Sequence, residues 1–415
     1  MHTSSNNLYP ERDQSFWQTG LILGSGLGIV SMVVGGTISK NYGAGVAVTS
    51  ILLGNFILWF IGLGIISMTD ARSHAIQNIK EKLGYFSSII AAIVFVAAFL
   101  VWYALQIKTP AQALAIAVDP KSIFDDTFEL RISASLGLLC ALISMGGIKT
   151  IKWFNISSFP LLIIFLSYIL TSSRTFVSFH NSWGISFVGI LLIVLTWFPG
   201  TVNLSTFFRH SRSRADSVLG LTLMTIVHAG FQFCFVLLDV GNPIDLIDIS
   251  KNSGDPLYFL SVIFFMVISF VCVNLLNIYW ASVGWEIFFK HKQEAKSYAI
   301  IGLFGTIIYM FFQYPFFISV IEFIGTSFIA ILGVTLITSY MIEIVVQHRI
   351  RTTDKLSNSI CWFLGCFSSL VFMSRNSNDL VASVTFGINV CLLVFGIIIF
   401  IEEILWSIKQ QIIKK

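Results

Sequence analysis

The feature that most constrains this chain is a series of twelve apolar runs, each about long enough to cross a membrane as a helix. Crossing about 30 Å of hydrocarbon takes roughly 20 mainly apolar residues. Only 11% of the residues are charged, against about 25% in a typical soluble domain. The sequence therefore predicts an all-α integral membrane protein with spans at about 17–38, 45–69, 84–107, 131–148, 154–172, 184–206, 218–240, 257–283, 297–314, 317–344, 359–375 and 383–407.

Two of these runs carry helix breakers in the middle. Residues 24–28 (GSGLG) interrupt the first run, and residues 196–201 (TWFPGT) interrupt the sixth. Gly lowers helix stability by about 1 kcal/mol relative to Ala, and Pro by about 3 kcal/mol. A break in hydrocarbon survives only where protein buries it or where it lines a cavity. Two interrupted spans at corresponding places in two halves indicate a transporter's binding site; the alternative is that the glycines only permit close helix packing.

The basic residues of the loops predict the orientation. With the N-terminus inside, 18 of the 25 Lys and Arg residues fall on the cytoplasmic side and seven fall outside. An excess of Lys and Arg residues marks the cytoplasmic loops. Both termini, with the polar tails 1–16 and 408–415, are therefore expected on the cytoplasmic side. The net charge of +4 comes from these loops and indicates no nucleic-acid partner.

No extramembrane stretch is long enough for a separate domain. The longest loops are expected at 108–130 and 241–256, and residues 70–84 read as a short amphipathic helix on the cytoplasmic side. Residues 207–216 mix aromatic and basic side chains, as expected of a segment on the inner leaflet. Since no short cleavable signal precedes the first span, we expect that span to be retained.

Motifs of enzymes are absent from the sequence, and none of the six cysteines has metal-ligand spacing. We therefore expect no enzymatic cofactor. Ionisable groups deep in the spans are few, because each costs about 2.5–3.5 kcal/mol at the membrane midplane. His228 in the seventh span is the clearest of them. It is either a neutral imidazole bonded to a neighbouring helix or a proton relay.

Neutral polar and aromatic side chains are more informative. Trp102 and Gln106 lie one turn apart in the third span, Trp197 lies at the break of the sixth, and Asn277 lies mid-span in the eighth. A flat heteroaromatic solute needs aromatic faces above and below it and hydrogen-bonding groups at its edge. Stacking a base on an aromatic side chain contributes about 1–3 kcal/mol. These residues predict a site for such a solute, unless the tryptophans serve only in packing.

With these residues in place, the sequence resembles the bacterial cytosine permeases of the nucleobase:cation symporter family, in the amino acid-polyamine-organocation superfamily. The resemblance covers spans one to ten in order and at nearly ungapped spacing. It is carried by Ser31-Met32, Gly35-Gly36-Thr37, Gly54-Asn55, Trp102 eighteen residues after Gly84, Phe207-Phe208-Arg209, Leu276-Asn277-Ile278 and Ile337-Thr338-Ser339-Tyr340-Met341.

The resemblance implies two inverted five-helix repeats, with spans one and six unwound and two extra helices at the C-terminus. The first repeat would cover 17–172, the second 184–344, and the helix pair 359–407. It also implies that a base is held between Trp102 and Trp197, with Asn277 at its edge and Ser31 near the break of span one. The other substrate-binding residues expected are Phe99, Gln106, Thr196 and Pro199.

Some family positions differ here. Phe99 replaces a glutamine one turn before Trp102, and Pro199 replaces a small hydroxyl residue. The paired hydroxyls that ligate sodium on span eight align with Trp280 and Ala281, which leaves Ser282 nearby. Carbonyls at Gly24 and Leu27 would complete the sodium site. Because a hard cation needs several oxygen ligands, the sequence predicts weak or absent sodium dependence, with protons as the alternative coupling ion.

The sequence thus predicts a secondary active transporter of the bacterial inner membrane that imports a nucleobase such as cytosine, or a related flat heterocycle, by alternating access. The alternatives are a transporter of the same fold for an amino acid, amine or vitamin, a membrane enzyme such as an acyltransferase using His228, and a channel. The enzyme would need an acid or nucleophile beside His228, and the channel a repeated pore motif; neither is found in the sequence. The partners expected are a small-molecule substrate and the lipid bilayer, and the sequence leaves the oligomeric state open.

Overall fold

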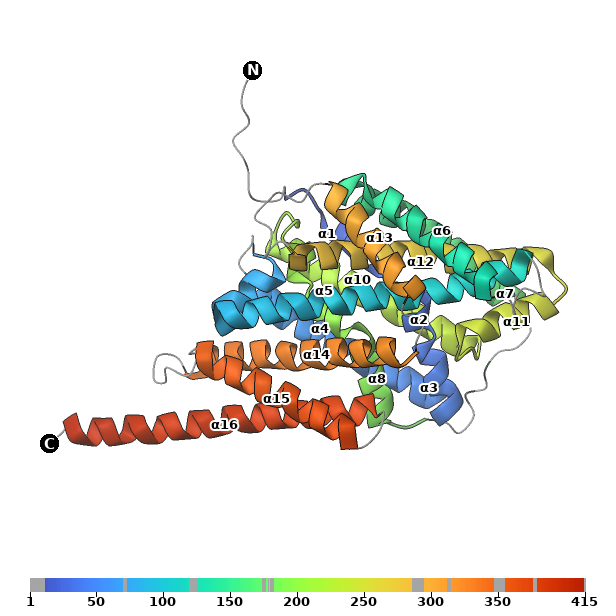
Figure 1. The fold of residues 1–415 in the computed structure, drawn as a ribbon. Helices are drawn as coiled ribbons and strands as arrows, with labels where there is room; N and C mark the ends of the chain where they lie inside the picture. Colours follow the sequence, from blue (N-terminus) through green and yellow to red (C-terminus); the bar gives the residue numbers. More distant parts are fainter. Residues whose placement is uncertain are drawn as a thin grey trace, which may run out of the picture.

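The computed structural model is a bundle of long α-helices (Figure 1). It describes residues 12–69, 73–118, 126–173, 177, 179, 183–285, 295–311, 315–346, 355–375 and 379–413. Within these residues the only β contact is an isolated bridge between Gln14 and Ser211. The predicted tails lie partly outside the described residues, which exclude 1–11 and 414–415.

The helices follow the predicted order of spans. The first half of the chain forms α1 (Phe16–Ser25), α2 (Ile29–Met32), α3 (Val34–Tyr42), α4 (Ala44–Met68), α5 (Ala75–Val118), α6 (Asp126–Ser144) and α7 (Gly147–Ser172). The second half forms α8 (Phe187–Val202), α9 (Ser205–Phe208), α10 (Arg214–Leu237), α11 (Pro243–Asn252), α12 (Pro256–Trp285), α13 (Ala295–Phe311), α14 (Pro315–Val346), α15 (Lys355–Arg375) and α16 (Leu380–Ile413).

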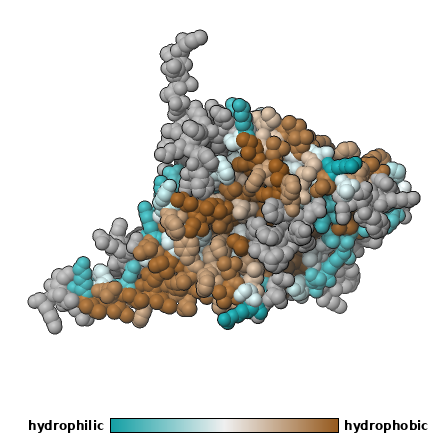
Figure 2. Space-filling model, viewed as in Figure 1, coloured by the Kyte–Doolittle hydropathy of each residue, from teal (hydrophilic) through white to brown (hydrophobic). Residues whose placement is uncertain are grey.

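Length and composition agree with a membrane protein. Among the described residues, nine helices are long and apolar enough to cross a membrane, and the bent pair of α1 with α2 and α3 makes a tenth. The shorter apolar helices α8 and α13 lie at the predicted sixth and ninth spans. Figure 2 shows hydrophobic side chains covering the long helices in this view, with hydrophilic ones mainly toward their ends. The predicted all-α membrane class is confirmed.

The break predicted in the first span is present. α1 ends at Ser25, and the chain bends by 88° before it continues as α2. Gly28 in the bend has φ 70° and ψ 147°, a conformation that glycine adopts without the strain a side chain would bring.

The break of the sixth span lies later than predicted. α8 stays helical through Pro199 and ends at Val202, and the interruption falls at Asn203 and Leu204. A proline inside a helix removes only one backbone donor, here the bond to the carbonyl of Leu195. The prediction of an unwound segment at 196–201 is therefore wrong in position, although span six is interrupted.

Two loop predictions also need correction. α5 consists of two helices that meet at Gly84, whose backbone is not helical (φ 86°, ψ 176°): the expected amphipathic helix before it, from Ala75, and the helix of span three after it, which continues through Pro110 to Val118. Residues 243–252, expected in a loop, form α11, whose start is capped by the side chain of Asn242 on the amide of Ile244. Much of the predicted loops 108–130 and 241–256 is thus helical.

Helix packing has the pattern expected of two related sets of five spans. α1 packs against α10, and its counterpart five spans later, α8, packs against α4. In the same way α7 packs against α12 while α14 packs against α5. The pairs α4 with α10, α5 with α12 and α6 with α13 each join two counterparts. α15 and α16 pack on each other beside α14 (Figure 1). The limits of the repeats, 17–172 and 184–344, stay a prediction.

Segments predicted to share the cytoplasmic side contact one another. The amide of Gln14 donates to the carbonyl of His210 (3.1 Å), and that of Arg212 donates to the carbonyl of Gln14 (2.9 Å). Lys152 Nζ lies 3.6 Å from Asp13 Oδ1. The chain before α1 is therefore on the same face as the loop 209–212, as the predicted topology requires.

Candidate functional site

A cavity of about 370 Å³, counting the open space at its mouth, lies at the break between α1 and α2. α5, α8 and α12 complete its wall. It is lined by Gly26, Leu27, Ser31, Phe99, Trp102, Gln106, Thr196, Trp197, Pro199, Gly200, Val273, Asn277 and Trp280. The structure thus brings together all eight residues predicted to bind substrate. Their role in binding stays a prediction.

Aromatic rings form much of the wall. The ring centroids of Trp197 and Trp280 are 5.6 Å apart and meet edge to face at 85°. Phe99 lies 5.0 Å from Trp280. Trp102, on α5 one turn after Phe99, lines the same cavity. Edge-to-face and tilted pairs are favourable because the positive edge of one ring meets the negative face of another. The walls are therefore flat, apolar surfaces held in place by their neighbours.

The polar groups of the wall are uncharged. Asn277 donates from Nδ2 to Asn274 Oδ1 (3.0 Å), and Asn274 donates in turn to the carbonyl of Tyr103 (3.2 Å). Gln106 Oε1 and the indole nitrogens of Trp102 and Trp280 are buried and have no hydrogen-bond partner within the described residues. Native interiors rarely leave such groups unpaired, so the wall is suited to a ligand that supplies the missing partners.

The segment around the break of α1 is tied to other helices. Gln232 on α10 bridges Asn55, which donates to its Oε1 (2.7 Å), and the carbonyl of Ser31, to which its Nε2 donates (3.5 Å). The Gln106 amide lies beside Gly28. Two buried amide side chains therefore hold the segment after the break: Gln232 at the carbonyl of Ser31 and Gln106 at Gly28.

His228 does not line the cavity but lies directly behind its wall. Its ring centroid is 4.6 Å from that of Trp197. Its Nε2 is 3.1 Å from the carbonyl of Leu23, one of the last carbonyls of α1, which lack full pairing within a helix. Because a carbonyl only accepts, Nε2 carries the hydrogen, and Nδ1 is the nitrogen left to take up a proton.

The predicted sodium ligands do not come together. Side chains at Gly26 and Gly28 would meet Leu276 and Val273, so this part of α12 faces the break. Ser282 lies six residues beyond Leu276, about 9 Å along the helix axis, and its hydroxyl donates to the carbonyl of Ile278 (2.7 Å). Ser282 therefore lies along α12 away from the part that faces the break.

The residue of α12 beside the end of α1 is Cys272. Its thiol lies beside the hydroxyls of Ser25 and Ser158, and the Ser25 hydroxyl donates to the carbonyl of Ile22 (3.0 Å). A hard cation prefers oxygen, whereas sulfur favours soft metals. Cys272 thus offers sulfur rather than a hard ligand, and the carbonyls at Gly24 and Leu27 alone supply too few ligands for sodium. The weak sodium dependence expected from the sequence stays a prediction.

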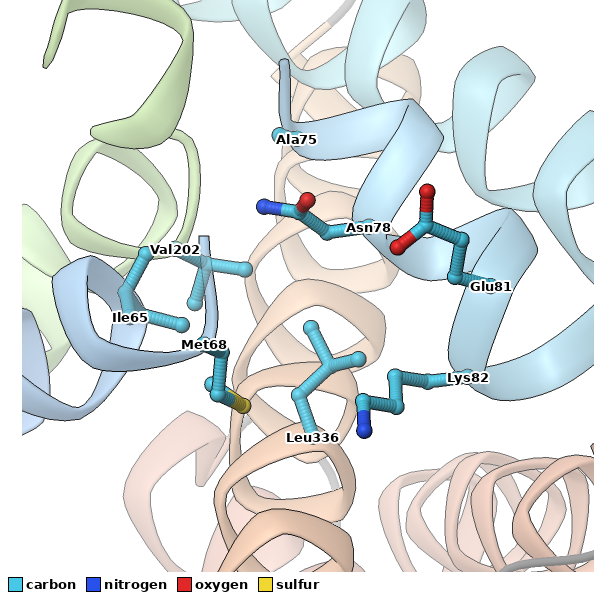
Figure 3. A pocket seen from close by; sticks show the side chains of 8 residues that line it. All are labelled: Ile65, Met68, Ala75, Asn78, Glu81, Lys82, Val202 and Leu336. Carbon is cyan, nitrogen blue, oxygen red and sulfur yellow. The ribbon is translucent and has the colours of Figure 1, made fainter. Parts of the chain in front are cut away.

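A second pocket lies toward the face that carries Lys82 (Figure 3). It is lined by Ile65, Met68, Ala75, Asn78, Glu81, Lys82, Val202 and Leu336. Val202 ends the helix whose preceding turn, Pro199 and Gly200, lines the central cavity. The last turn of α8 therefore separates the two spaces. The ion pair of Lys82 with Glu343 (2.6 Å) joins α5 to α14 close by.

Four residues of the central cavity were missed as binding residues by the sequence analysis: Gly26, Gly200, Val273 and Trp280. On α12, Val273, Asn277 and Trp280 are four and three residues apart, the spacing of one helix face. That spacing, counted from Asn277, was the signal available for Trp280.

Comparisons with known proteins identify neighbours of the same fold. No protein-family model matches the chain, and no curated protein matches it. Several solved structures do match it. Mhp1, a nucleobase-cation-symport-1 family transporter in a closed conformation with bromovinylhydantoin bound, aligns over 94% of both chains with a TM-score of 0.66 and 14% identity. The chain has the fold of this transporter. The inward-facing conformation of Mhp1 aligns with a TM-score of 0.64 and 13% identity, over 97% of this chain and 95% of that one.

A substrate-bound, outward-open Na+-coupled sialic acid symporter also matches, with a TM-score of 0.68, 13% identity, and coverage of 95% and 92% of the two chains. These neighbours are transporters rather than enzymes. Neighbours of the same fold thus bind molecules as different as a hydantoin and a sialic acid, so the fold alone does not indicate what this chain binds.

Proposed function

We propose that this protein is a secondary active transporter that imports a flat, uncharged heterocycle, such as a nucleobase, by alternating access. The observation that carries the proposal is the central cavity: three tryptophans and Phe99 surround it, uncharged hydrogen-bonding groups lie at its edges, and none of its described lining residues is charged. The transporter fold is consistent with this function.

Each group in the wall has a role in the proposal. Trp102 and Trp197 stack on the two faces of the ring, since base stacking on an aromatic contributes about 1–3 kcal/mol. Gln106 and Asn277 hydrogen-bond its edge. Ser31 and Thr196 add polar groups, while Phe99 and Pro199 set the shape of the space. Access alternates when the broken segments of spans one and six move relative to α5 and α12.

An amino acid, amine or vitamin transporter is the closest rival, because the sialic acid symporter shows that the fold accepts a charged substrate. The ends of α1 and α2 at the break present backbone groups that favour charge. The cavity, however, offers no described charged side chain to pair with an ionised group. The neutral heterocycle accounts for the aromatic walls as well.

For the coupling ion we propose protons taken up at Nδ1 of His228, with weak dependence on sodium. His228 is buried, bonded to the end of α1 and packed on Trp197, so a change in its charge acts on both the break and the cavity wall. An enzyme using His228 is not supported, since the groups it contacts in the described residues, the Leu23 carbonyl and the Trp197 ring, are neither acids nor nucleophiles.

We propose the bacterial inner membrane as the location, with both termini in the cytoplasm. A cysteine introduced by Arg212→Cys should then be protected from an impermeant label added outside, whereas one introduced by Lys251→Cys should react. The reverse pattern would overturn this topology.

The proposed substrate class is tested by a binding screen of purified protein in detergent. Uracil, cytosine, adenine, hypoxanthine and a hydantoin are compared with amino acids and amines by thermal shift and calorimetry. A ligand that binds the folded state raises its apparent stability in proportion to RT ln(1 + [L]/Kd). We expect stabilisation by at least one heterocycle and by none of the amino acids or amines; the opposite result would favour the rival.

A further inference from the structure

Two consecutive aromatic residues of α12 enclose the ring of Phe207, which belongs to α9. The ring centroids of Phe207 and Tyr279 are 4.8 Å apart and the rings meet at 66°. Those of Phe207 and Trp280 are 6.2 Å apart and the rings meet at 83°. Such edge-to-face pairs are favourable, and all three residues are buried. Because Trp280 lines the central cavity, Phe207 connects the cavity wall to Tyr279.

The hydroxyl of Tyr279 takes part in three hydrogen bonds. It donates to the carbonyl of Thr206 (3.1 Å) and accepts from Nη2 of Arg209 (3.2 Å). Nε2 of His210 lies 2.8 Å from the same oxygen. Since the single hydroxyl hydrogen is used on Thr206, this nitrogen donates as well. Tyr279 therefore joins α12 both to α9 and to the loop that follows α9.

That loop also holds the residues before α1. The backbone of Gln14 is hydrogen-bonded to the backbones of His210 and Arg212. The start of span one and the end of span six are thus bound to each other, on the face that we propose to be cytoplasmic. Tyr279 fastens this pair of segments to α12, which belongs to neither span.

We propose that Tyr279 is a latch that keeps the cytoplasmic side closed, and that Phe207 links this latch to the cavity wall at Trp280. The inference rests on the proposed function, in which the broken segments of spans one and six move relative to α12. For these segments to leave α12, the bonds at the Tyr279 hydroxyl must break and Phe207 must leave its place between the two rings. A change at Trp280 in the cavity therefore alters the strength of the latch.

A buried cysteine measures the opening of this latch. Val283 is 1% exposed and lies one turn after Tyr279. It also lies seven residues after Leu276, which is next to Gly26 at the break of α1, and residues at this spacing share a helix face. A cysteine introduced by Val283→Cys becomes accessible to a thiol reagent when the ends of spans one and six leave α12. Its modification rate in purified, ligand-free, full-length protein therefore reports the fraction of open molecules.

Tyr279→Phe removes the hydroxyl and keeps the ring that contacts Phe207. We expect the modification rate to rise roughly tenfold or more, because the variant loses a hydrogen bond from a charged group together with two others. Protein without Val283→Cys gives the background from the six native cysteines.

Tyr103→Phe is the matched control. The Tyr103 hydroxyl is also buried and bonded, to the carbonyl of Gly137 (3.2 Å) and to Thr306 Oγ1 (3.2 Å). These bonds join α5 to α6 and α13, away from spans one and six. Tyr103→Phe should lower thermal stability, as Tyr279→Phe does, and leave the modification rate unchanged.

A double-mutant cycle tests the link through Phe207. Trp280→Leu and Phe207→Leu should each raise the modification rate, because each removes one ring of the cluster. The double variant should react no faster than Phe207→Leu alone, since Trp280 acts on the latch through that ring. Thermal unfolding confirms that each variant is folded.

Three results would overturn the inference. An unchanged rate in Tyr279→Phe, or an equal rise in Tyr103→Phe, would show that Tyr279 is no latch. Effects of Trp280→Leu and Phe207→Leu that multiply would show that the two rings act independently. All these rates are measured without ligand, so they do not depend on which molecule the cavity binds. If no heterocycle of the screen binds wild type, the proposed function fails and these rates are unaffected.

Discussion

The amide of Gln106 lies against the backbone of Gly28: a methyl group at Gly28 would sit 3.1 Å from both Oε1 and Nε2 of Gln106. The break of α1 and the polar edge of the cavity are therefore in direct contact. Gly28→Ala would add a side chain at φ 70°, which costs about 1–3 kcal/mol in strain, and would displace the Gln106 amide. We expect reduced thermal stability together with weaker ligand binding.

Gly147 supplies the matched control for this variant. It also has positive φ (73°), but a methyl group there would meet nothing within 4 Å. Gly147→Ala should lose a similar amount of stability and leave the ligand Kd unchanged. Equal binding by both variants and wild type would separate Gln106 from the break and remove the proposed coupling between them.

Trp102→Ala should weaken ligand binding because it removes one of the two stacking faces. The expected loss is about 1–3 kcal/mol, which corresponds to roughly 5- to 150-fold in Kd, measured by calorimetry on folded protein in detergent. Trp153→Ala, on the exposed surface of α7, is the control. Unchanged affinity in Trp102→Ala would reduce Trp102 to a packing residue.

Pro199→Ala should affect transport more than stability. Since α8 is already helical at Pro199, alanine fits the backbone and adds a hydrogen bond to the Leu195 carbonyl, while it removes the proline ring from the cavity wall. We expect thermal stability to be kept or raised and uptake into proteoliposomes to slow, because the last turn of α8 between the two pockets becomes stiffer.

Pro160 offers a comparison, as a proline inside α7 that does not line the cavity. Pro160→Ala should leave uptake unchanged. If Pro199→Ala transports as fast as wild type, the last turn of α8 does not have to move during transport.

Much of the site could be predicted from residue chemistry and order. Gly28 signals a break because few other residues accept its backbone conformation, and Trp102, Gln106 and Asn277 stand out as polar or aromatic groups in apolar runs. Pro199 led to the wrong position for the break in span six. The low helix propensity of proline overstates its effect here, because a helix packed among its neighbours tolerates the loss of one backbone hydrogen bond. Trp280 was missed although it lies three residues after Asn277 on the same helix face, because in a largely buried helix that spacing fits packing as well as binding.

The register of buried α12 against the break could not be predicted from the sequence. Ser282, the hydroxyl expected near a sodium site, lies further along α12 than Val273 and Leu276, which face the break. An apolar helix without strong motifs permits several registers, and only the packing of α1 on α12 fixes one of them. Residues 241–256 were expected to form a loop because they contain turn-forming residues. The burial of Leu246 and Ile247 stabilises α11 there instead.

Uptake should depend weakly on sodium. Replacement of sodium by choline at fixed pH should change initial uptake rates in proteoliposomes less than about twofold, because Cys272 offers sulfur rather than an oxygen ligand beside the end of α1. An inward proton gradient should accelerate uptake, and His228→Gln, which keeps a donor for the Leu23 carbonyl but not a titrating ring, should fold and lose that acceleration. A steep fall in the uptake rate of wild type in choline would contradict this. If the rate of Ser158→Ala did not depend on sodium, the hydroxyls beside Cys272 would be shown to hold the ion.

The central claim is that the cavity carries a flat, uncharged heterocycle across the membrane. The most direct test is uptake of radiolabelled uracil and cytosine into proteoliposomes, compared with protein-free liposomes and with the Trp102→Ala variant. We predict that wild type shows saturable uptake, which unlabelled uracil inhibits and amino acids do not. The uptake rate should be strongly reduced in Trp102→Ala. Accumulation of an amino acid or amine in the absence of any heterocycle uptake would contradict the account.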